Sequence, residues 1–336
     1  MGWLKSNTFH HSEMAGLEEL VALKERKGYK ISLAFPTLNE EATIGEEIEI
    51  IKKILSEDYP LLDEIVVIDS GSTDETLKVA KEAGAEVYHS ADILPRMGNY
   101  MGKGENLWKS LFVLEGDIIV WLDADIKNIH PKFVYGLVGG LLKYEHLLFV
   151  KAYYQRPIQL NGEENEYGGG RVTEILVRPL FSLFFPELAT LYQPCSGECA
   201  GKRELLEMLP FPCGYGIETG MLIDIYNRFG PQVIGQVNLD LRIHRNQPAW
   251  ALGKMGFEIL YAFLNRLKKL GKIELNQEIY QSYRKLEMKP DLYELIEESI
   301  QINERPPIIM IPEYRERHVK ARDKAGLENL LFTHQA

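Results

Sequence analysis

The sequence predicts an α/β fold in which a doubly wound, mostly parallel sheet is flanked by helices. Two observations support this fold class: short apolar runs alternate with amphipathic segments, and polar residues follow each apolar run directly. Parallel strands are joined by right-handed crossovers, and such sheets bind ligands outside the carboxyl ends of their strands. Residues just after each strand are therefore the first candidates for a functional site.

The first unit begins with an amphipathic helix over residues 17–27, which Gly28 ends. The run ISLAFPTL (31–38) has no helical spacing and suits a buried strand of a parallel sheet. After a polar turn, apolar residues recur at helical intervals over 44–56. The order is therefore strand, polar turn and helix.

The same unit then repeats. A strand over 65–68 is followed by a polar turn over 69–74, a helix closed by Gly84, and a third strand that begins AEVYHS. The segment GKGENLWKSLFVLEG predicts another helix, and DIIVWLDADI another strand that ends in acidic residues. A parallel sheet is the expected result.

Beyond about residue 131, predicted strands and helices no longer alternate regularly. A helix is predicted over 217–229 after the turn CGYG, and VNLDLRI reads as a strand before His244. Residues 249–271 and 276–304 are predicted to be helical. The chain length allows one large domain or two of ordinary size.

The charge balance is acidic, with 38 Lys and Arg against 49 Asp and Glu, a formal net charge of −11. An acidic chain repels nucleic acid, and phosphorylated ligands would need locally concentrated cations or a metal. Three cysteines are too few for a disulfide scaffold and fit a reducing cytoplasm. No apolar stretch predicts a secretion signal or a membrane span, because charges and prolines break the most apolar run, 176–192.

Asp123 and Asp125 follow a buried strand with one residue between them. Two carboxylates in this arrangement point to the same side and repel each other unless a cation neutralises them. They can share a divalent cation, or divide between a ribose hydroxyl and a metal. His244, at another predicted strand end, can complete a metal site begun by Asp125.

Further segments favour anion binding. Asp69 and Ser70 stand at a strand end before a predicted helix N-terminus, and Lys103 lies between two glycines at a helix start. Three glycines followed by Arg171 and Thr173 offer free N–H groups and a forked cation to a phosphate or a carboxylate. Helix capping or a surface loop would also account for each segment taken alone.

In this order, the segments FPTLNEE, VVIDSGSTDET and LDAD resemble a family-2-like glycosyltransferase with a GT-A fold. A closer resemblance, to the retaining glucosyl-3-phosphoglycerate synthases of family 81, is carried by GKGENLWKSL, GGGRVTEILVRPL, QPCSGECAG, PFPCGYGIETGMLID and IHRNQP. It extends from about Ile31 to Pro248.

The resemblance implies transfer of glucose from a nucleoside-diphosphate glucose, UDP-glucose first, to the 2-hydroxyl of 3-phosphoglycerate with retention of configuration. The product would be a precursor of the compatible solute glucosylglycerate. Mg²⁺ or Mn²⁺ is the implied cofactor, and a cytoplasmic homodimer without nucleic-acid or membrane partners is the implied form. Three regions follow: a nucleotide-sugar half (1–130), an acceptor and sugar half (131–250) and a helical C-terminal extension (251–336) that forms the dimer.

The resemblance also implies a role for individual positions. The donor nucleotide would be bound by Pro36, Thr37, Leu38, Glu40, Ser70, Lys103 and Asp123, and the metal by Asp125 and His244. The acceptor would be bound by Gly170, Arg171, Thr173 and Asn246, and the transferred sugar by Tyr215 and Glu218. The implied catalytic groups are Asp125, Glu218 and the backbone carbonyl of Cys195, where the family usually has another apolar residue.

Alternative functions remain open at this stage. Mannosyl-3-phosphoglycerate synthesis from a guanosine donor would change one hydroxyl contact. A polyprenyl-phosphate glycosyltransferase predicts a membrane span or basic amphipathic anchor, and neither is evident. A sugar-nucleotide uridylyltransferase predicts a basic glycine-rich loop after the first strand, where this chain has the acidic PTLNEE. A non-catalytic scaffold would need neither a metal pair nor an anion loop.

Overall fold

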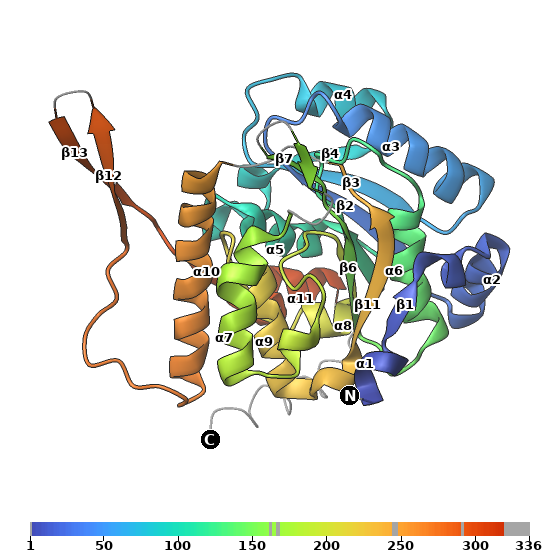
Figure 1. Cartoon of the computed structure of the whole chain (residues 1–336). Helices are drawn as coiled ribbons and strands as arrows, with labels where there is room; N and C mark the ends of the chain where they lie inside the picture. Colours follow the sequence, from blue (N-terminus) through green and yellow to red (C-terminus); the bar gives the residue numbers. More distant parts are fainter. Residues whose placement is uncertain (1, 161–162, 166–168, 244–247, 290–291, 319–336) are drawn as a thin grey trace.

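The structure is a computed structural model, and it describes residues 2–160, 163–165, 169–243, 248–289 and 292–318. Its centre is an eight-stranded sheet with the order β1-β11-β6-β9-β5-β2-β3-β4 (Figure 1). The strands are β1 (Thr8–His10), β2 (Ile31–Thr37), β3 (Glu64–Asp69), β4 (Glu86–His89), β5 (Ile118–Trp121), β6 (Phe149–Gln155), β9 (Cys199–Lys202) and β11 (Ile234–Leu241).

Strand direction confirms the predicted mostly parallel sheet. Strand β9 runs antiparallel to both neighbours, β5 and β6, whereas the other adjacent pairs of this described sheet are parallel. An antiparallel strand starts at the edge where its parallel neighbours end. The segment before Cys199 therefore reaches the same edge as the residues that follow β2, β3, β5 and β11.

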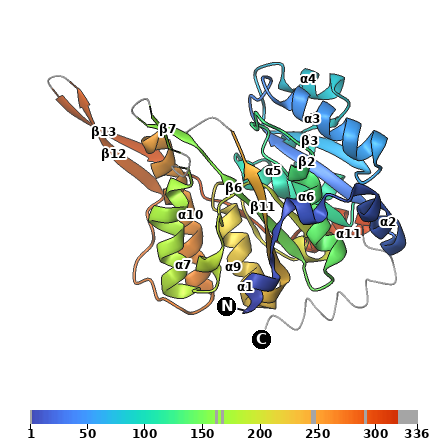
Figure 2. The same ribbon diagram turned by 45° about the vertical axis from the view of Figure 1, so that its right-hand side comes forward.

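Helices cover both faces of the sheet (Figure 2). The helices are α1 (Gly2–Ser6), α2 (Leu17–Lys27), α3 (Ile44–Lys52), α4 (Thr76–Glu82), α5 (Lys103–Val113), α6 (Lys132–Lys143), α7 (Arg178–Phe184), α8 (Arg203–Leu206), α9 (Ile217–Phe229), α10 (Ala249–Lys269) and α11 (Pro312–His318). Apolar residues of α2, α3, α4 and α6 form one core, and those of α5, α7, α9, α10 and α11 form the other.

Strand β2 shows why the apolar runs are continuous. Leu33 and Phe35 face the core under α3, and Ala34 between them faces the core under α5. A strand buried on both faces needs apolar residues at every position, as the sequence indicated. The helices predicted over 17–27 and 217–229 have the predicted bounds.

The C-terminal region is only partly helical. Helix α10 confirms the helix predicted over 249–271, but the prediction of helix over 276–304 is wrong, because β12 (Ser282–Lys289) and β13 (Leu292–Ser299) form an antiparallel hairpin. Cross-strand apolar pairs, such as Leu286 with Leu295, alternate with pairs that contain charged residues, which is the period of a strand.

The remaining short strands are β7 (Ile158–Leu160), β8 (Glu163–Asn165), β10 (Phe211–Pro212) and β14 (Glu304–Arg305). Strand β1 was not expected from the sequence; it pairs in parallel with β11, with Phe9 opposite Val237. None of the helices within the described residues combines the length and apolarity needed to cross a membrane.

Candidate functional site

The two aspartates after β5 lie against an arginine that the sequence analysis did not single out. Arg242 follows β11, and its Nη2 is 3.1 Å from Asp123 Oδ2 and 2.7 Å from Asp125 Oδ1. Its side chain is 1% exposed. The strand ends of β5 and β11 are therefore joined by a buried guanidinium that contacts both carboxylates of the DxD pair.

The same guanidinium also holds a third carboxylate. Arg242 Nε is 2.9 Å from Glu198 Oε1, and Glu198, the residue directly before β9, is completely buried. The hydroxyl of Tyr154 donates a hydrogen bond to the other oxygen of Glu198. Burial opposes the charge of Arg242, but the surrounding acids outweigh it and keep its pKa well above the ordinary value.

The two aspartates have opposite pKa shifts. Burial disfavours ionisation of Asp123, but the charges of Lys103 and Arg242 outweigh it and hold the pKa of Asp123 well below its ordinary value. Burial is the main cause of the raised pKa of Asp125. The attraction of Arg242 opposes this shift, and the repulsion of Asp123 and Glu198 adds to it. The charged form of Asp125 is thus only partly stabilised by Arg242, and a further cation beside it would favour that form.

Lys103 connects the aspartate pair to helix α9. Its ammonium hydrogen-bonds to Asp123 Oδ1 and lies 3.1 Å from Glu218 Oε1, in the first turn of α9. Burial works against its charge, yet Asp123 and Glu218 raise its pKa well above the ordinary value. A side chain on Gly104 would place Cβ 1.8 Å from the carbonyl oxygen of Pro212. The GKG and PFPCG motifs therefore touch each other, and this contact positions Lys103.

The segment before β9 is fixed on both sides of Cys195. Gln193 Nε2 donates to the Tyr154 carbonyl at 2.6 Å, and Ser196 Oγ donates to the Ala152 carbonyl at 2.6 Å. Burial raises the pKa of the Cys195 thiol to about 11, and Glu218 adds to the shift. The thiol is therefore protonated at neutral pH, and the backbone around it is held rigidly against β6.

Gly197 explains how this segment approaches the DxD pair so closely. A Cβ built on Gly197 would lie 2.2 Å from Asp123 Oδ2. Any side chain there would push Asp123 away from Arg242 and Lys103. The glycine of QPCSGECAG is thus required by the packing of Asp123.

The loops after β2 and β3 are linked through Asp69. Thr37 Oγ1 donates to Asp69 Oδ1 at 3.1 Å, and the N–H groups of Gly71 and Ser72 donate to Asp69 Oδ2 at 2.8 Å each. Ser70 Oγ accepts a hydrogen bond from Asn106 of α5 at 2.8 Å. The predicted donor residues of these two strands therefore belong to one hydrogen-bonded edge.

The other predicted donor residues lie on the same edge. Pro36 is opposite Ile68 within the sheet, and the Glu40 N–H donates to Thr76 Oγ1 at 2.8 Å. Leu38 is 46% exposed, so an apolar side chain stands open to solvent beside these loops.

The glycine-rich segment leads into a helical turn at the predicted acceptor residues. Gly170 has a φ of 77°, in the left-handed region, and its carbonyl accepts from the Glu174 N–H at 3.1 Å. Thr173 is buried, and its side chain is near enough to the Cys195 thiol to lower the pKa of that thiol in part against the larger effect of burial. The Gly169 N–H donates to the Arg156 carbonyl at 3.0 Å. The predicted acceptor segment thus adjoins Cys195.

Tyr215 stands before α9 with a half-exposed ring, and its N–H donates to Glu258 Oε2 at 2.8 Å. The structure brings Lys103, Asp123, Asp125 and Glu218 together, with Arg242 as an addition that the sequence analysis missed. The predicted metal ligand His244 and the predicted acceptor residue Asn246 lie outside the described residues.

Comparison with known proteins shows the family of this chain. Residues 32–208, just over half of the chain, match the model of glycosyl transferase family 2. The glucosyl-3-phosphoglycerate synthase of Petrotoga mobilis is 58% identical over 313 residues, which cover 93% of this chain and 96% of the relative.

Two solved structures are similar throughout. Mannosyl-3-phosphoglycerate synthase from Rubrobacter xylanophilus superimposes with a TM-score of 0.83 at 35% identity, covering 91% of this chain and 96% of its own. Glucosyl-3-phosphoglycerate synthase from Mycobacterium tuberculosis, solved with Mn²⁺, UDP-glucose and phosphoglyceric acid, gives a TM-score of 0.78 at 40% identity, covering 90% and 97%. This chain therefore belongs to the glucosyl-3-phosphoglycerate synthases, within glycosyl transferase family 2.

Proposed function

We propose that this chain transfers glucose from UDP-glucose to the 2-hydroxyl of 3-phosphoglycerate with retention of anomeric configuration. The observation that carries the proposal is the network in which the buried Arg242 and the partly buried Lys103, Asp123 and Asp125 meet at the carboxyl edge of the sheet. It lies in a chain 58% identical to a glucosyl-3-phosphoglycerate synthase. A relative with this fold is solved with UDP-glucose and phosphoglyceric acid together.

The residues present fit a divalent cation. Three carboxylates, Asp123, Asp125 and Glu198, surround Arg242, and their mutual repulsion contributes to the raised pKa of Asp125. Carboxylate oxygens are ligands that Mg²⁺ and Mn²⁺ prefer. Asp125 would hold the ion together with His244, and the ion would stabilise the charge that develops on the departing diphosphate.

The other roles in binding and catalysis are assigned to side chains and backbone groups of the protein. Asp123 stays ionised between Lys103 and Arg242 and is suited to accept hydrogen bonds from a ribose. Glu218 is ion-paired with Lys103, so we assign it, with Tyr215, to the sugar hydroxyls rather than to covalent attack. The Cys195 carbonyl would face the reacting carbon, and the departing phosphate would take the proton of the acceptor hydroxyl.

The acceptor assignment makes a prediction about Arg171. Arg171→Ala should raise the KM for 3-phosphoglycerate far more than the KM for UDP-glucose, because a forked cation binds phosphate and carboxylate groups in two-point fashion. Steady-state kinetics with each substrate varied in turn measure both constants. Equal increases in both would move Arg171 out of the acceptor site.

The overall activity is tested by release of nucleoside diphosphate from UDP-, GDP- and ADP-sugars, with and without 3-phosphoglycerate. We expect release from UDP-glucose that requires both the acceptor and Mg²⁺ or Mn²⁺, and that a chelator stops. If no donor turns over with 3-phosphoglycerate and added Mg²⁺, the proposed function is wrong.

Mannosyl transfer is the second candidate, because a mannosyl-3-phosphoglycerate synthase is among the solved structures with the same fold. The two sugars differ in the configuration at one carbon, so one hydroxyl contact separates them. Faster release of GDP from GDP-mannose than of UDP from UDP-glucose, in the assay above, would favour this candidate.

We also propose that the chain acts as a homodimer and that the β12–β13 hairpin contributes to the contact. The hairpin stands off the body of the molecule beside α10 (Figures 1 and 2). Leu286, Met288, Leu292 and Tyr293 are each about 70% exposed or more. A lone two-stranded hairpin is marginally stable in water, so these side chains are expected to pack on a second copy.

The dimer proposal predicts that Leu286→Glu with Met288→Glu gives a monomer, because charges at a buried contact cost several kcal/mol. Sedimentation equilibrium measures the mass. The matched control replaces Lys285 and Glu287, which neighbour Leu286 in β12, by Gln, and this variant should still sediment with the mass of a dimer. A wild-type chain that sediments as a monomer would contradict the proposal.

The proposed cellular site is the cytoplasm, and its support is the chemistry of the cysteines. Cys195, Cys199 and Cys213 are all free thiols, and the last two are buried. In the eight-stranded sheet, the proposed nucleotide half supplies β2 to β5, together with β1 at the opposite edge, and the proposed acceptor half supplies β6, β9 and β11. The proposed division therefore puts the site near the junction of β5 and β9.

A further inference from the structure

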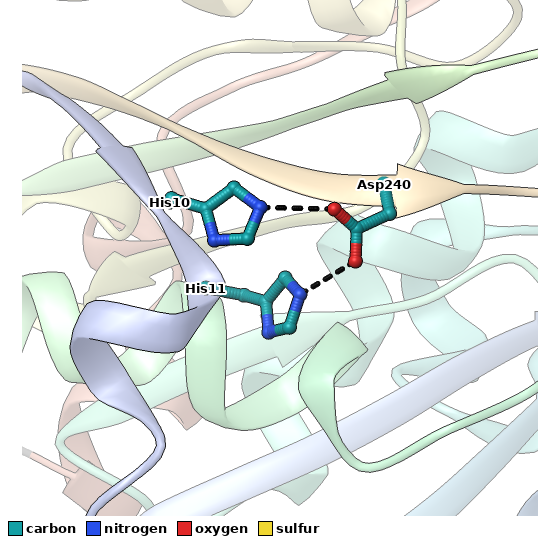
Figure 3. A group of neighbouring side chains, drawn as sticks. All are labelled: His10, His11 and Asp240. Carbon is teal, nitrogen blue, oxygen red and sulfur yellow. Dashed lines mark hydrogen bonds and ion pairs between the residues drawn. The ribbon is translucent and has the colours of Figure 1, made fainter.

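A second group of potential ligands lies away from the aspartate pair. Figure 3 shows His10 and His11, at the junction of β1 and the following turn, pointing at Asp240 near the end of β11. His10 Nε2 is 2.9 Å from Asp240 Oδ1, and His11 Nε2 is 2.6 Å from Asp240 Oδ2. The three ligand atoms lie within 4.8 Å of one another. Two imidazoles thus converge on one carboxylate.

The outer nitrogens of both rings also have oxygen partners. His10 Nδ1 is 2.8 Å from Ser12 Oγ, and His11 Nδ1 is 3.2 Å from Tyr135 Oη. Histidines that bind metals through Nε2 nearly always direct the Nδ1 hydrogen to such an oxygen, which fixes the ring and its tautomer. In His11 this supporting contact is already in place. His10 Nδ1 also accepts the Ser12 N–H at 3.3 Å, and that contact would give way to the one with Ser12 Oγ when Nδ1 carries the hydrogen.

The residue that supplies the carboxylate has an unusual backbone conformation. Asp240 has a φ of 64°, which non-glycine residues rarely adopt, and the pairing of β11 with β6 shifts register between Asn238 and Leu241. The Asp240 N–H donates to Asn238 Oδ1 at 2.9 Å. Such conformations persist where surrounding structure fixes them, and they cluster at functional sites.

We propose that His10, His11 and Asp240 bind a transition-metal ion, with Zn²⁺ as the natural occupant. Bonds of about 2.0–2.1 Å in tetrahedral geometry place neighbouring ligand atoms about 3.3 Å apart. The two nitrogen–oxygen contacts, now 2.9 Å for His10 and 2.6 Å for His11, would therefore lengthen by roughly half an ångström to admit the ion. His10 and Asp240 are 42% and 46% exposed, which leaves water access to complete the coordination. This site would tie the N-terminal strand to β11.

Protonation is compatible with this role. Metal binding requires a neutral imidazole with a bare Nε2, and burial lowers the pKa of His11 despite the opposing contact with Asp240. The Nε2 hydrogen that each ring now directs at Asp240 would move to Nδ1, where the oxygens of Ser12 and Tyr135 accept it. The Asp240 pKa lies well below its ordinary value, because hydrogen bonds from Lys132, His10 and His11 outweigh its burial.

Lys132 is the competing cation at the site. Its Nζ is 2.9 Å from Asp240 Oδ2, and its charge also acts on His11. An ammonium this close repels a metal ion and occupies one carboxylate oxygen. The proposal therefore predicts that Lys132→Gln binds Zn²⁺ more tightly than the parent protein, about tenfold or more. If His10 and His11 only hydrogen-bond to Asp240 and bind no metal, neither the parent protein nor Lys132→Gln should bind Zn²⁺.

The experiment uses the full chain with Asp125→Asn, so that the DxD pair contributes little to metal binding. Chelator-treated protein is dialysed against Zn²⁺, the bound zinc is measured by elemental analysis, and Co²⁺ substitution gives an absorption spectrum. We expect one Zn²⁺ per chain, lost in His11→Gln and in Asp240→Asn. Asn also tolerates the left-handed conformation, so Asp240→Asn preserves the backbone.

The matched control is His146→Gln, which removes an exposed histidine that hydrogen-bonds to the N-terminal segment at Asn7. It should retain the zinc. Zn²⁺ should also raise the Tm of the parent protein and leave the Tm of His11→Gln unchanged. The proposal is overturned if the Asp125→Asn chain binds no zinc. It is also overturned if His11→Gln and Asp240→Asn, in the same background, bind as much zinc as that chain. Because zinc content and Tm are the readouts, failure here is separate from failure of the transferase activity.

Discussion

Arg242→Met is expected to weaken both the fold and metal binding at the DxD pair. The substitution leaves Asp123, Asp125 and the fully buried Glu198 without their shared guanidinium. Removing one partner of a buried ion pair costs about 3–5 kcal/mol, and loss of a residue that orients a metal ligand lowers metal affinity about 10- to 100-fold. Denaturant unfolding and Mn²⁺ titration measure the two effects.

Two further variants test whether the charge cluster is the cause. Adding Glu198→Gln to Arg242→Met should recover part of the lost stability, because one stranded carboxylate is removed. Arg317→Met, which breaks an exposed pair with Glu115, should have little effect. If Arg242→Met keeps the parent's stability and Mn²⁺ affinity, Arg242 is not the organising cation of the site.

Lys103→Met is expected to act mainly on the donor. It leaves Asp123 and Glu218 facing each other without the ammonium between them. A charged hydrogen bond contributes about 1.5–3 kcal/mol, so kcat/KM for UDP-glucose should fall about 10- to 100-fold. The KM for 3-phosphoglycerate should change much less, the opposite of the pattern predicted for Arg171→Ala. Steady-state kinetics with each substrate varied provide the comparison.

Lys78→Met is the control for this substitution, because Lys78 pairs with Glu75 on the surface of α4 and lies outside the site. It should leave the kinetics unchanged. A Lys103→Met enzyme whose donor and acceptor constants change equally would show that Lys103 supports the fold around α5 rather than the donor site.

The sheet could be predicted because each central strand is buried on both faces. The continuous apolar run of β2 and the helical spacing of Ile44, Ile48 and Ile51 in α3 are direct consequences of that burial. The hairpin could not be predicted in the same way. Its strands lie largely in water, so their alternation is weak, and charged residues such as Lys285 and Glu287 occupy positions where a helix would also place them.

The acidic half of the site was predictable, and its cationic organiser was not. Asp123 and Asp125 stand directly after a buried strand, where charge is informative. Arg242 follows an alternating strand that reads as ordinary, and its buried partner Glu198 is the residue directly before the antiparallel strand β9. The signal that was present is position: Arg242 is the first residue after β11, at the same edge as the aspartates.

The pairing of β1 with β11 also has a consequence for synthesis. Asn7 Nδ2 bonds to the carbonyl of Ile234, a residue 227 positions later in the chain. At about 5–20 residues per second, the N-terminal strand leaves the ribosome roughly 10–45 s before its partner exists. During that time its edge has nothing to pair with in the native sheet. Strand β1 is only three residues long and ends in His10, features that make it a poor template for another chain.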